Sequence, residues 1–354
     1  SLLTVHRAAT MTDLRFWLAF NLVQGIGAVK TRALIDAFGD LETAWKAGSA
    51  DLARAGLDRR ALQSLMETRG RLDLDHECER LETSGATMLT WETPTYPSLL
   101  KQIHDPPPVL YMRGALTEAD AFAVSIVGTR QATAYGKEVA RQLATDLAHN
   151  NVTVVSGLAR GIDAAAHQAA LDAKGRTIAV LGCGVDVVYP PEHRKLAERI
   201  AEGGALVSDY PLGTQPDAPN FPARNRIISG LSLGTEVVEG GLDSGALITA
   251  AFAMEQGRDV FAVPGNIFHK GSAGVNRLIQ EGAKLVTGVT DVLQELNLTM
   301  VEQHQQARLA IPENETESAL MAALSLEPTH IDAIGRQVAL PIATVSATLT
   351  MMEL

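Results

Sequence analysis

The chain has 354 residues, of which 46% are hydrophobic and 5% aromatic, as is typical of a globular protein with two or three domains. Two cysteines are too few for a disulfide framework or a metal cage, so we expect no metal site and a reducing, cytoplasmic compartment. The formal charge of −11 argues against a broad basic surface, so a nucleic acid would need a local groove of arginines and backbone amides.

The N-terminal part is predicted to be helical. Apolar residues recur at three- and four-residue spacings from Leu14 to Leu22 and from Leu34 to Trp45, and Gly25-Ile26-Gly27 separates the two segments. We therefore expect a helical domain over residues 11–77, of the helix-hairpin-helix or SAM-like type. Its glycine turn is able to offer amides to a DNA phosphate, but a small helical bundle with a tight turn fits the pattern equally well.

The central part is predicted to be a doubly wound α/β domain. Prolines at 94, 97 and 106–108 lead to a predicted edge strand at Val109–Met112. From Ala123 onward, apolar strands alternate with amphipathic helices, which indicates a mostly parallel, Rossmann-like sheet over residues 85–298. The expected strands are Ala123–Val127, Val152–Val155, Thr177–Leu181, Ala205–Ser208, Thr235–Glu239 and Asp259–Val263. The expected helices are Tyr135–Asn150, Asp163–Lys174, Pro191–Glu202, Arg226–Leu231, Ala246–Gln256 and Gly274–Glu281.

The C-terminal part is predicted to be a small winged-helix-like domain over residues 312–354, after a polar linker at Met300–Arg308. Its expected helices are Glu317–Leu324, Ile331–Val338 and Ile342–Leu354. The last helical pattern still runs at Leu354, so we expect the domain to be truncated before its wing. Residues 299–354 hold two arginines and seven acidic residues, and the last helix has neither lysine nor arginine. A protein-contact or regulatory role is therefore expected there.

Small and basic residues cluster where strands are expected to end. In a doubly wound sheet all strand-to-helix loops leave the carboxyl edge, so these residues are predicted to meet on one rim. The sequence FPARNRIISGLS places arginines at an expected helix start, where the helix dipole disfavours cations, so an anion is predicted beside them. The candidate phosphate-binding residues of the four loops are Gly128, Thr129, Arg130, Gly157, Arg160, Gly161, Arg224, Asn225, Arg226, Ser244 and Gly245.

No catalytic residue or cofactor site is predicted on this rim. The chain has no G-x-x-x-x-G-K-[ST] motif and no G-x-G-x-x-G motif followed by a ribose-binding acid. We expect Asp163 to cap the helix that follows it, His167 to be buried and hydrogen-bonded, and Cys183 to be a packing residue. A phosphate-binding rim without a catalytic group favours a binding protein over an enzyme.

Six segments together resemble a known family. They are SIVGTR, SGLARGIDAAAH, TIAVLGCGVDVVYP, FPARNRIISGLS, SGALITAAFAMEQGRDVFAVPG and NRLIQEGAKLV. In this order and spacing they resemble the DNA-processing protein A family (DprA, also called Smf), over residues 85–298. Two small departures are Asp209, where glutamate is commoner, and Gly240, where alanine is frequent. The resemblance implies a non-enzymatic protein that binds single-stranded DNA, forms a homodimer and loads the RecA recombinase during natural transformation.

The resemblance also implies roles for particular residues. Arginines of the GTR, GLARG and FPARNR motifs would bind DNA, and Asn225, Ser244 and Gly245 would complete the pocket. Phe221 or Tyr210 is the nearest aromatic residue for base stacking, although either is able to serve as a core residue. Leu278 and Ile279 fit either core packing or a dimer interface.

Two other classes of function remain open from the sequence. Gly234-Thr235, with Glu236 and Glu239 nearby, partly resembles the PGG-x-GT-x-x-E loop of phosphoribohydrolases, although the PGG portion is absent. Such an enzyme would release a base from a nucleoside monophosphate. A protein-only adaptor would bind no oligonucleotide.

Overall fold

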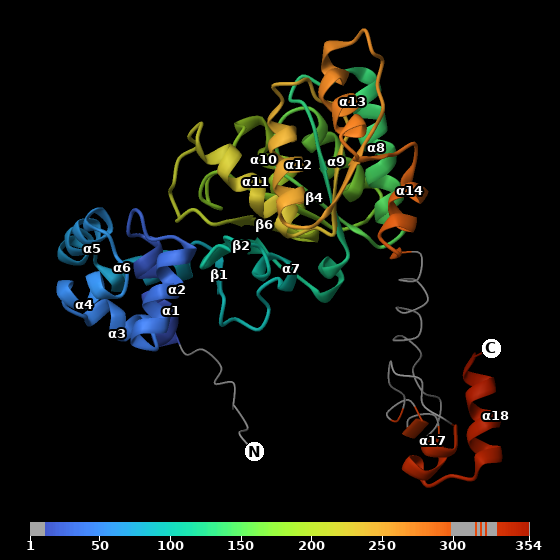
Figure 1. The fold of residues 1–354 in the computed structure, drawn as a ribbon, viewed down its shortest axis with the longest axis horizontal. Helices are drawn as coiled ribbons and strands as arrows, with labels where there is room; N and C mark the ends of the chain where they lie inside the picture. Colours follow the sequence, from blue (N-terminus) through green and yellow to red (C-terminus); the bar gives the residue numbers. More distant parts are fainter. Residues whose placement is uncertain (1–10, 299–315, 317–318, 321–322, 324–330, 354) are drawn as a thin grey trace. The chain divides into compact units, whose positions relative to one another are not determined.

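The computed structural model describes residues 11–298, 316, 319–320, 323 and 331–353 (Figure 1). The chain divides into two compact units, Ser1–Leu298 and Thr299–Leu354. Within the described ranges, no helix has the length and apolar character needed to span a membrane.

Six helices open the described part of the first unit, and aspartates cap three of them. Asp40, Asp58 and Asp73 each accept a hydrogen bond from a backbone amide in the first turn of the following helix. Gly25, with φ of 85°, makes the turn between the first two helices. The six are α1 (Met11–Asn21), α2 (Ala28–Phe38), α3 (Leu41–Lys46), α4 (Ser49–Arg54), α5 (Arg59–Arg71) and α6 (Leu74–Thr83).

These helices share a hydrophobic core with the sheet. Trp17, Phe20 and Leu34 form one buried cluster that also contains Met88 and Tyr111 from the first two strands. The helical segment expected over residues 11–77 therefore belongs to the same compact unit as the sheet. The apolar faces of these helices pack against one another and also against residues of the first two strands.

A nine-stranded sheet forms the centre of the unit. Its order is β1-β2-β6-β5-β4-β3-β7-β8-β9, and β3 to β9 are parallel while β1 and β2 pair antiparallel. The strands are β1 (Thr87–Thr90), β2 (Val109–Gly114), β3 (Ala123–Val127), β4 (Thr153–Ser156), β5 (Thr177–Val180), β6 (Ala205–Ser208), β7 (Gly234–Val237), β8 (Asp259–Ala262) and β9 (Lys284–Leu285). The six expected parallel strands are confirmed. The strand predicted at Val109–Met112 is confirmed as β2, but its predicted place at the edge of the sheet is wrong, because β1 pairs outside β2.

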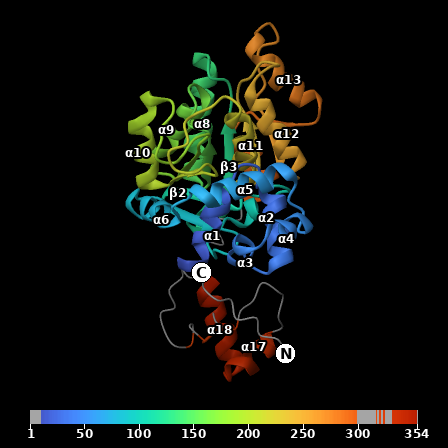
Figure 2. The ribbon, with the colours of Figure 1, turned by 90° about the vertical axis from the view of Figure 1, so that its left-hand side faces the viewer.

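Helices cover both faces of this sheet, which confirms the doubly wound, Rossmann-like fold. Figure 2 shows α8, α9 and α10 on one side and α11, α12 and α13 on the other. The helices after β1 are α7 (Ser98–Lys101), α8 (Ala134–His149), α9 (Ile162–Asp172), α10 (Arg194–Gly203), α11 (Asn220–Gly230), α12 (Gly245–Glu255), α13 (Ala273–Gln280) and α14 (Val289–Glu295). Three 3₁₀ turns accompany them: η1 (Glu118–Ala121), η2 (Pro191–His193) and η3 (Lys270–Ser272).

The strand order reverses at β3. Strands β4, β5 and β6 follow on one side of it, and β7, β8 and β9 follow on the other. The loops after β3 and β7 therefore diverge and leave a crevice at the carboxyl edge, where ligands bind in open α/β sheets.

The second unit contains a helix-turn-helix pair, α17 (Ile331–Val338) and α18 (Ile342–Glu353). Leu320, Ile334 and Val345 form its buried core. Ala339, with φ of 56°, makes the turn between the two helices. The expected linker Met300–Arg308 lies outside the described residues, and the expected helix Glu317–Leu324 is described only at 319–320 and 323, which are helical.

Candidate functional site

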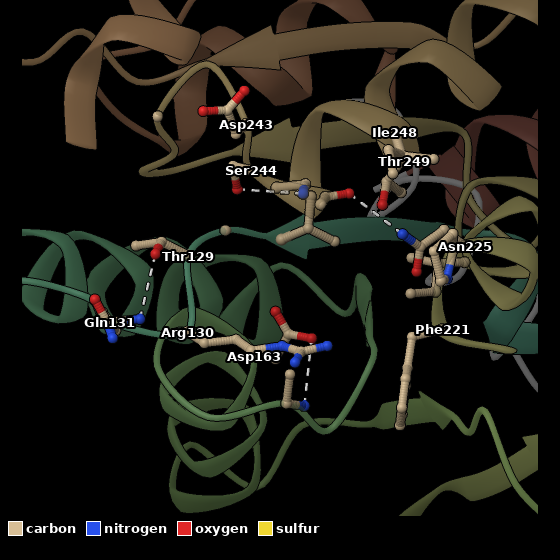
Figure 3. A pocket seen from close by; sticks show the side chains of 18 of the residues that line it. Thr129, Arg130, Gln131, Asp163, Phe221, Asn225, Asp243, Ser244, Ile248 and Thr249 are labelled. Carbon is tan, nitrogen blue, oxygen red and sulfur yellow. Dashed lines mark hydrogen bonds between the residues drawn. The ribbon is translucent and has the colours of Figure 1, made fainter. Parts of the chain in front are cut away.

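A cavity of about 720 Å³ lies at the strand-order reversal. The loops after β3, β4 and β7 form its walls together with α11 and the first turns of α12 (Figure 3). Its polar and charged lining residues are Thr129, Arg130, Gln131, Asp163, Arg224, Asn225, Asp243, Ser244, Thr249 and Lys270. The convergence predicted from the sequence is therefore present, and the rim is a concave site.

Arg130 is the predicted arginine that is best placed to bind an anion. It is exposed, and among the described residues no side-chain hydrogen bond or ion pair engages its guanidinium group. The guanidinium carbon lies 5.4 Å from the ring centroid of Phe221, which also lines the cavity. The guanidinium group of Arg130 thus lies next to the half-buried ring of Phe221. Such a pair is suited to bind the phosphate and the base of one nucleotide.

Arg224 lines the same cavity but is only 4% exposed. Its Nη1 donates to the carbonyl oxygens of Gly157, at 2.9 Å, and of Val180. Burial lowers the pKa of Arg224, an effect that the nearby carboxylate of Asp163 opposes. Arg224 therefore ties α11 to the ends of β4 and β5, and its Nε is left without a hydrogen-bond partner within the described chain.

Arg224 and Arg226 do not lie at the start of a helix, so that prediction is wrong. Helix α11 begins at Asn220, so Arg224 and Arg226 lie in its second turn, away from the positive end of the helix dipole. Arg226 does not line the cavity. Its Nη2 donates to Asp209 Oδ2 at 2.6 Å, and its Nη1 donates to the carbonyl oxygen of Asp105 at 2.8 Å. In this structure Arg226 therefore links α11 to Asp209 and Asp105.

Arg160 stands beside the cavity and is paired. Its Nε donates to Glu192 Oε1 at 2.5 Å, and both side chains are about half exposed. It borders a small adjoining pocket with Tyr189 and Phe221, whose ring centroids are 5.5 Å apart. An exposed ion pair of this kind contributes little to stability, so a phosphate is able to replace the carboxylate of Glu192.

The start of α12 brings polar groups to the opposite wall. Ser244 is the N-cap residue, and its hydroxyl accepts the amide of Ala246 at 3.3 Å. Gly245 is exposed, and a Cβ added there would meet nothing within 4 Å. The side-chain amide of Asn225 donates to the carbonyl oxygen of Gly245 at 3.3 Å, so α11 and α12 are joined across the cavity.

Two charged residues of the cavity are not among the phosphate-binding residues predicted from the sequence. Lys270, in the turn η3 before α13, and Asp243, in the loop after β7, both line the cavity and are exposed. No side-chain partner engages Lys270 in the part of the chain that the structure describes. The available signal was topological, because the loop after β8 leaves the same carboxyl edge as the glycine-rich loops.

Three of the four predicted glycines, Gly128, Gly157 and Gly161, serve loop packing. A Cβ on Gly128 would lie 2.4 Å from Ile162 Cγ1, and one on Gly157 would lie 2.7 Å from Arg224 Nη2. Gly161 has φ of 81°, and its Cβ would lie 2.3 Å from the carbonyl oxygen of Thr129. The amide of Thr129 is also used, because it donates to the carbonyl oxygen of Glu239 at 2.7 Å. These residues hold the loops together and offer a ligand little, so the contacts with an anion fall to the arginine and lysine side chains of the cavity.

Several residues outside the predicted site are structural, as expected. His167 is buried, its Nδ1 lies 2.6 Å from Thr177 Oγ1, and burial lowers its pKa to about 3. Cys183 is buried in an apolar cluster, and burial raises its pKa to about 11. Asp163 is structural, but it accepts the amide of Gly157 at 3.1 Å where a cap of its own helix was expected. Burial raises the pKa of its carboxyl group.

The acidic residues behind the enzyme alternative do not reach the cavity. Glu236 is fully buried within β7. Glu239 is 4% exposed, and its Oε2 accepts hydrogen bonds from the amide and the hydroxyl of Thr133 at 3.1 and 3.0 Å. Neither residue lines the site. Among the described residues, no group of three or more His, Cys, Asp or Glu side chains is placed to hold a metal ion.

The fold and the cavity define a Rossmann-like protein with a cationic, aromatic-lined site at the switch point of its sheet. The sequence profile of the DNA recombination-mediator protein A family matches residues 87–297, and that of the DprA winged helix domain matches residues 304–354. The chain therefore belongs to the DprA/Smf family of DNA recombination mediators.

Relatives and solved structures agree with this assignment. Protein Smf of Synechocystis sp. is 37% identical over 96% of this chain and 94% of its own length, and DNA processing protein DprA of Bacillus subtilis is 46% identical over 60% and 72%. The X-ray structure of DprA from Streptococcus pneumoniae matches with a TM-score of 0.71 and 36% identity, over 82% of this chain and 99% of that one. DprA from Helicobacter pylori, whose structure is described as revealing a unique single-stranded DNA binding mode, matches with a TM-score of 0.54 and 30% identity, over 60% and 95%.

Proposed function

We propose that this protein binds single-stranded DNA in the cavity at the switch point. The observation that carries the proposal is the unpaired, exposed guanidinium group of Arg130 beside the ring of Phe221. Arg130 and Lys270 contact phosphates, and Phe221 stacks with a base. The solved relative from Helicobacter pylori, described as binding single-stranded DNA, supports the same ligand.

The other predicted residues take supporting roles in this proposal. Ser244 and the amide of Gly245 bind a phosphate at the N-terminus of α12, where the helix dipole favours an anion. Arg160 contacts a phosphate of the bound DNA after its ion pair with Glu192 breaks. Arg224 and Arg226 hold α11 in place and make no phosphate contact in the proposed complex.

Titration of labelled oligonucleotides against salt tests this proposal. Arg130→Ala is expected to weaken the binding of single strands of every sequence and to flatten the dependence of log K on log salt by about one unit, because one phosphate contact is lost. Arg141→Ala is the matched control, because Arg141 is an exposed arginine of α8 that lines no described pocket. Equal salt slopes in wild-type protein and Arg130→Ala would refute the assignment.

We further propose that the bound strand is passed to RecA and that this protein catalyses no reaction itself. The proposal rests on family membership, because members are DNA recombination mediators, and it places the protein in the cytoplasm with its DNA substrate. RecA filament formation on strands already covered by a single-strand-binding protein is expected to accelerate when this protein is added. No acceleration would refute the RecA step. Release of base from nucleoside monophosphates would instead support the enzyme alternative.

The proposed homodimer uses the edge of the sheet at α13 and β9. Leu278 is 6% exposed and belongs to the core, so it is unsuited to a contact. Ile279 is half-buried, and Leu285 on the edge strand is 44% exposed. Sedimentation of Ile279→Glu is expected to show a monomer with an unchanged circular dichroism spectrum. A dimer in that variant would place the interface elsewhere.

A further inference from the structure

The loop between β8 and α13 carries two strongly exposed apolar side chains. Ile267 is 81% exposed and Phe268 is 91% exposed, more than any other large apolar side chain in the described residues. The loop is also well braced behind its tip. The side chain of Asn276 bonds both the amide and the carbonyl oxygen of Gly265 at 3.0 Å, and Asn266 Oδ1 accepts the amide of Phe268 at 2.9 Å. The exposed ring is therefore presented on a fixed support.

This loop continues one wall of the cavity. Lys270, two residues after Phe268, lines the cavity. A Cβ on Gly241 would lie 3.2 Å from the carbonyl oxygen of Lys270, so the loop abuts the segment that follows β7. His269 Nδ1 lies 3.9 Å from Glu239 Oε1, next to the hydrogen bonds between Glu239 and Thr133. Phe268 thus lies in a loop that borders the same site, two residues from a residue that lines the cavity.

We propose that Phe268 is a second stacking platform, which binds a base of the single strand where it leaves the cavity. This inference rests on the proposed function and extends its binding path beyond Lys270. A flat ring with both faces open suits a nucleobase, and the adjacent cation holds the phosphate of the same segment. Ile267 gives the base an apolar neighbour.

Stacking on Phe268 also selects single strands over duplexes. Bases in a duplex are already stacked and paired, so an exposed ring gains nothing unless a base is extruded at a cost of a few kcal/mol. A protein partner is the other occupant that an exposed apolar loop suits. Lys270, which follows Phe268 by two residues and has no side-chain partner among the described residues, favours the polyanion, as does the wall that the loop shares with the cavity.

The test compares Phe268→Ala with wild-type protein on two probes, a thymidine dinucleotide that fits within the cavity and an oligothymidylate of about 20 nucleotides, which exceeds typical single-strand footprints. We expect on the order of a 10-fold loss of affinity for the long probe, the usual effect of removing one stacking side chain, and no loss for the dinucleotide or a duplex. The salt slope should stay at its wild-type value, because no charge is removed.

Two further variants separate stacking from general apolar contact. Phe268→Trp is expected to retain affinity for the long probe, and Phe268→Leu is expected to share the loss in Phe268→Ala, since leucine keeps apolar bulk without a flat ring. Wild-type affinity in Phe268→Leu would overturn the stacking role. The exposure of this side chain lets each variant fold, which thermal unfolding verifies.

The outcomes distinguish this inference from the proposed function. If Arg130→Ala loses binding and Phe268→Ala binds the long probe like wild-type protein, the cavity remains the proposed DNA-binding site and the stacking role of Phe268 is refuted. If wild-type protein binds no single strand, the proposed function itself falls. A changed sedimentation coefficient in Phe268→Ala, together with unchanged DNA affinity, would overturn the inference in favour of a protein contact.

Discussion

Replacing Glu236 by glutamine should remove a large part of the pH dependence of stability of the first unit. Glu236 lies on β7 in register with Ile126 of β3 and Phe261 of β8, and it is fully buried. Neither carboxylate oxygen has a hydrogen-bond partner among the described residues. Burial raises the pKa of Glu236 from 4.5 to about 8, so the folded protein holds this carboxyl group in its neutral form at pH 7.

The sign and size of the effect follow from the two pKa values. Between them the folded chain binds a proton that the unfolded chain has released, so the free energy of unfolding falls as pH rises from about 4.5 to about 8. One pKa unit corresponds to about 1.4 kcal/mol, so Glu236 should lower the free energy of unfolding by about 4 kcal/mol between about pH 5 and about pH 9. Glutamine does not titrate, so the variant should gain this amount over wild-type protein across that range.

Urea unfolding followed by tryptophan fluorescence measures this difference. All three tryptophans, Trp17, Trp45 and Trp91, lie in the first unit and therefore report on it. Subtracting wild-type from variant values cancels the other titrating groups, and any fixed cost of a buried amide is the same at every pH. Glu138→Gln, an exposed change on α8, is the control and should give a constant difference. Parallel curves for Glu236→Gln and wild-type protein would refute the reasoning.

Three other changes give expected outcomes. Asp243→Asn removes an exposed carboxylate from the cavity wall and should raise single-strand affinity a few-fold at low salt in an anisotropy titration; unchanged affinity would place the strand elsewhere. Gly161→Ala combines a φ of 81° with a Cβ 2.3 Å from a carbonyl oxygen, so urea unfolding should show a loss of about 2 to 4 kcal/mol, whereas Gly245→Ala should show little change. Arg226→Ala leaves the carboxylate of Asp209, which is 18% exposed, without its cation and should lower stability by about 2 kcal/mol. The salt slope of DNA binding should stay unaltered, and a flatter slope would return Arg226 to the phosphate contacts.

Local patterns in the sequence determined most of the secondary structure of the first unit. The β-branched runs that predicted six parallel strands are confirmed, because a strand buried on both faces has to be apolar throughout. The two-residue strand β9 and the edge strand β1 were missed, since short edge strands carry little periodic signal. The start of α11 was misplaced by six residues, at Arg226 where the helix begins at Asn220.

The location of the site was also within reach of the sequence. Parallel strands send their following loops to one edge, so the convergence of the loops that contain Arg130 and Ser244 follows from chain order. The loop after β8 leaves the same edge, so chain order also places Lys270 near the site.

Only the tertiary structure decided which cations are free to bind a ligand. Three arginines of similar motifs have different surroundings. Among the described residues Arg130 has no hydrogen-bond or ion-pair partner for its guanidinium group. Arg224 donates to backbone carbonyl oxygens of β5 and of the loop after β4, and Arg226 donates to Asp209, all of them distant in the sequence. A sequence gives the charge of a side chain. Whether that charge is paired inside the protein or left free for a ligand depends on desolvation and on the neighbours that folding brings together.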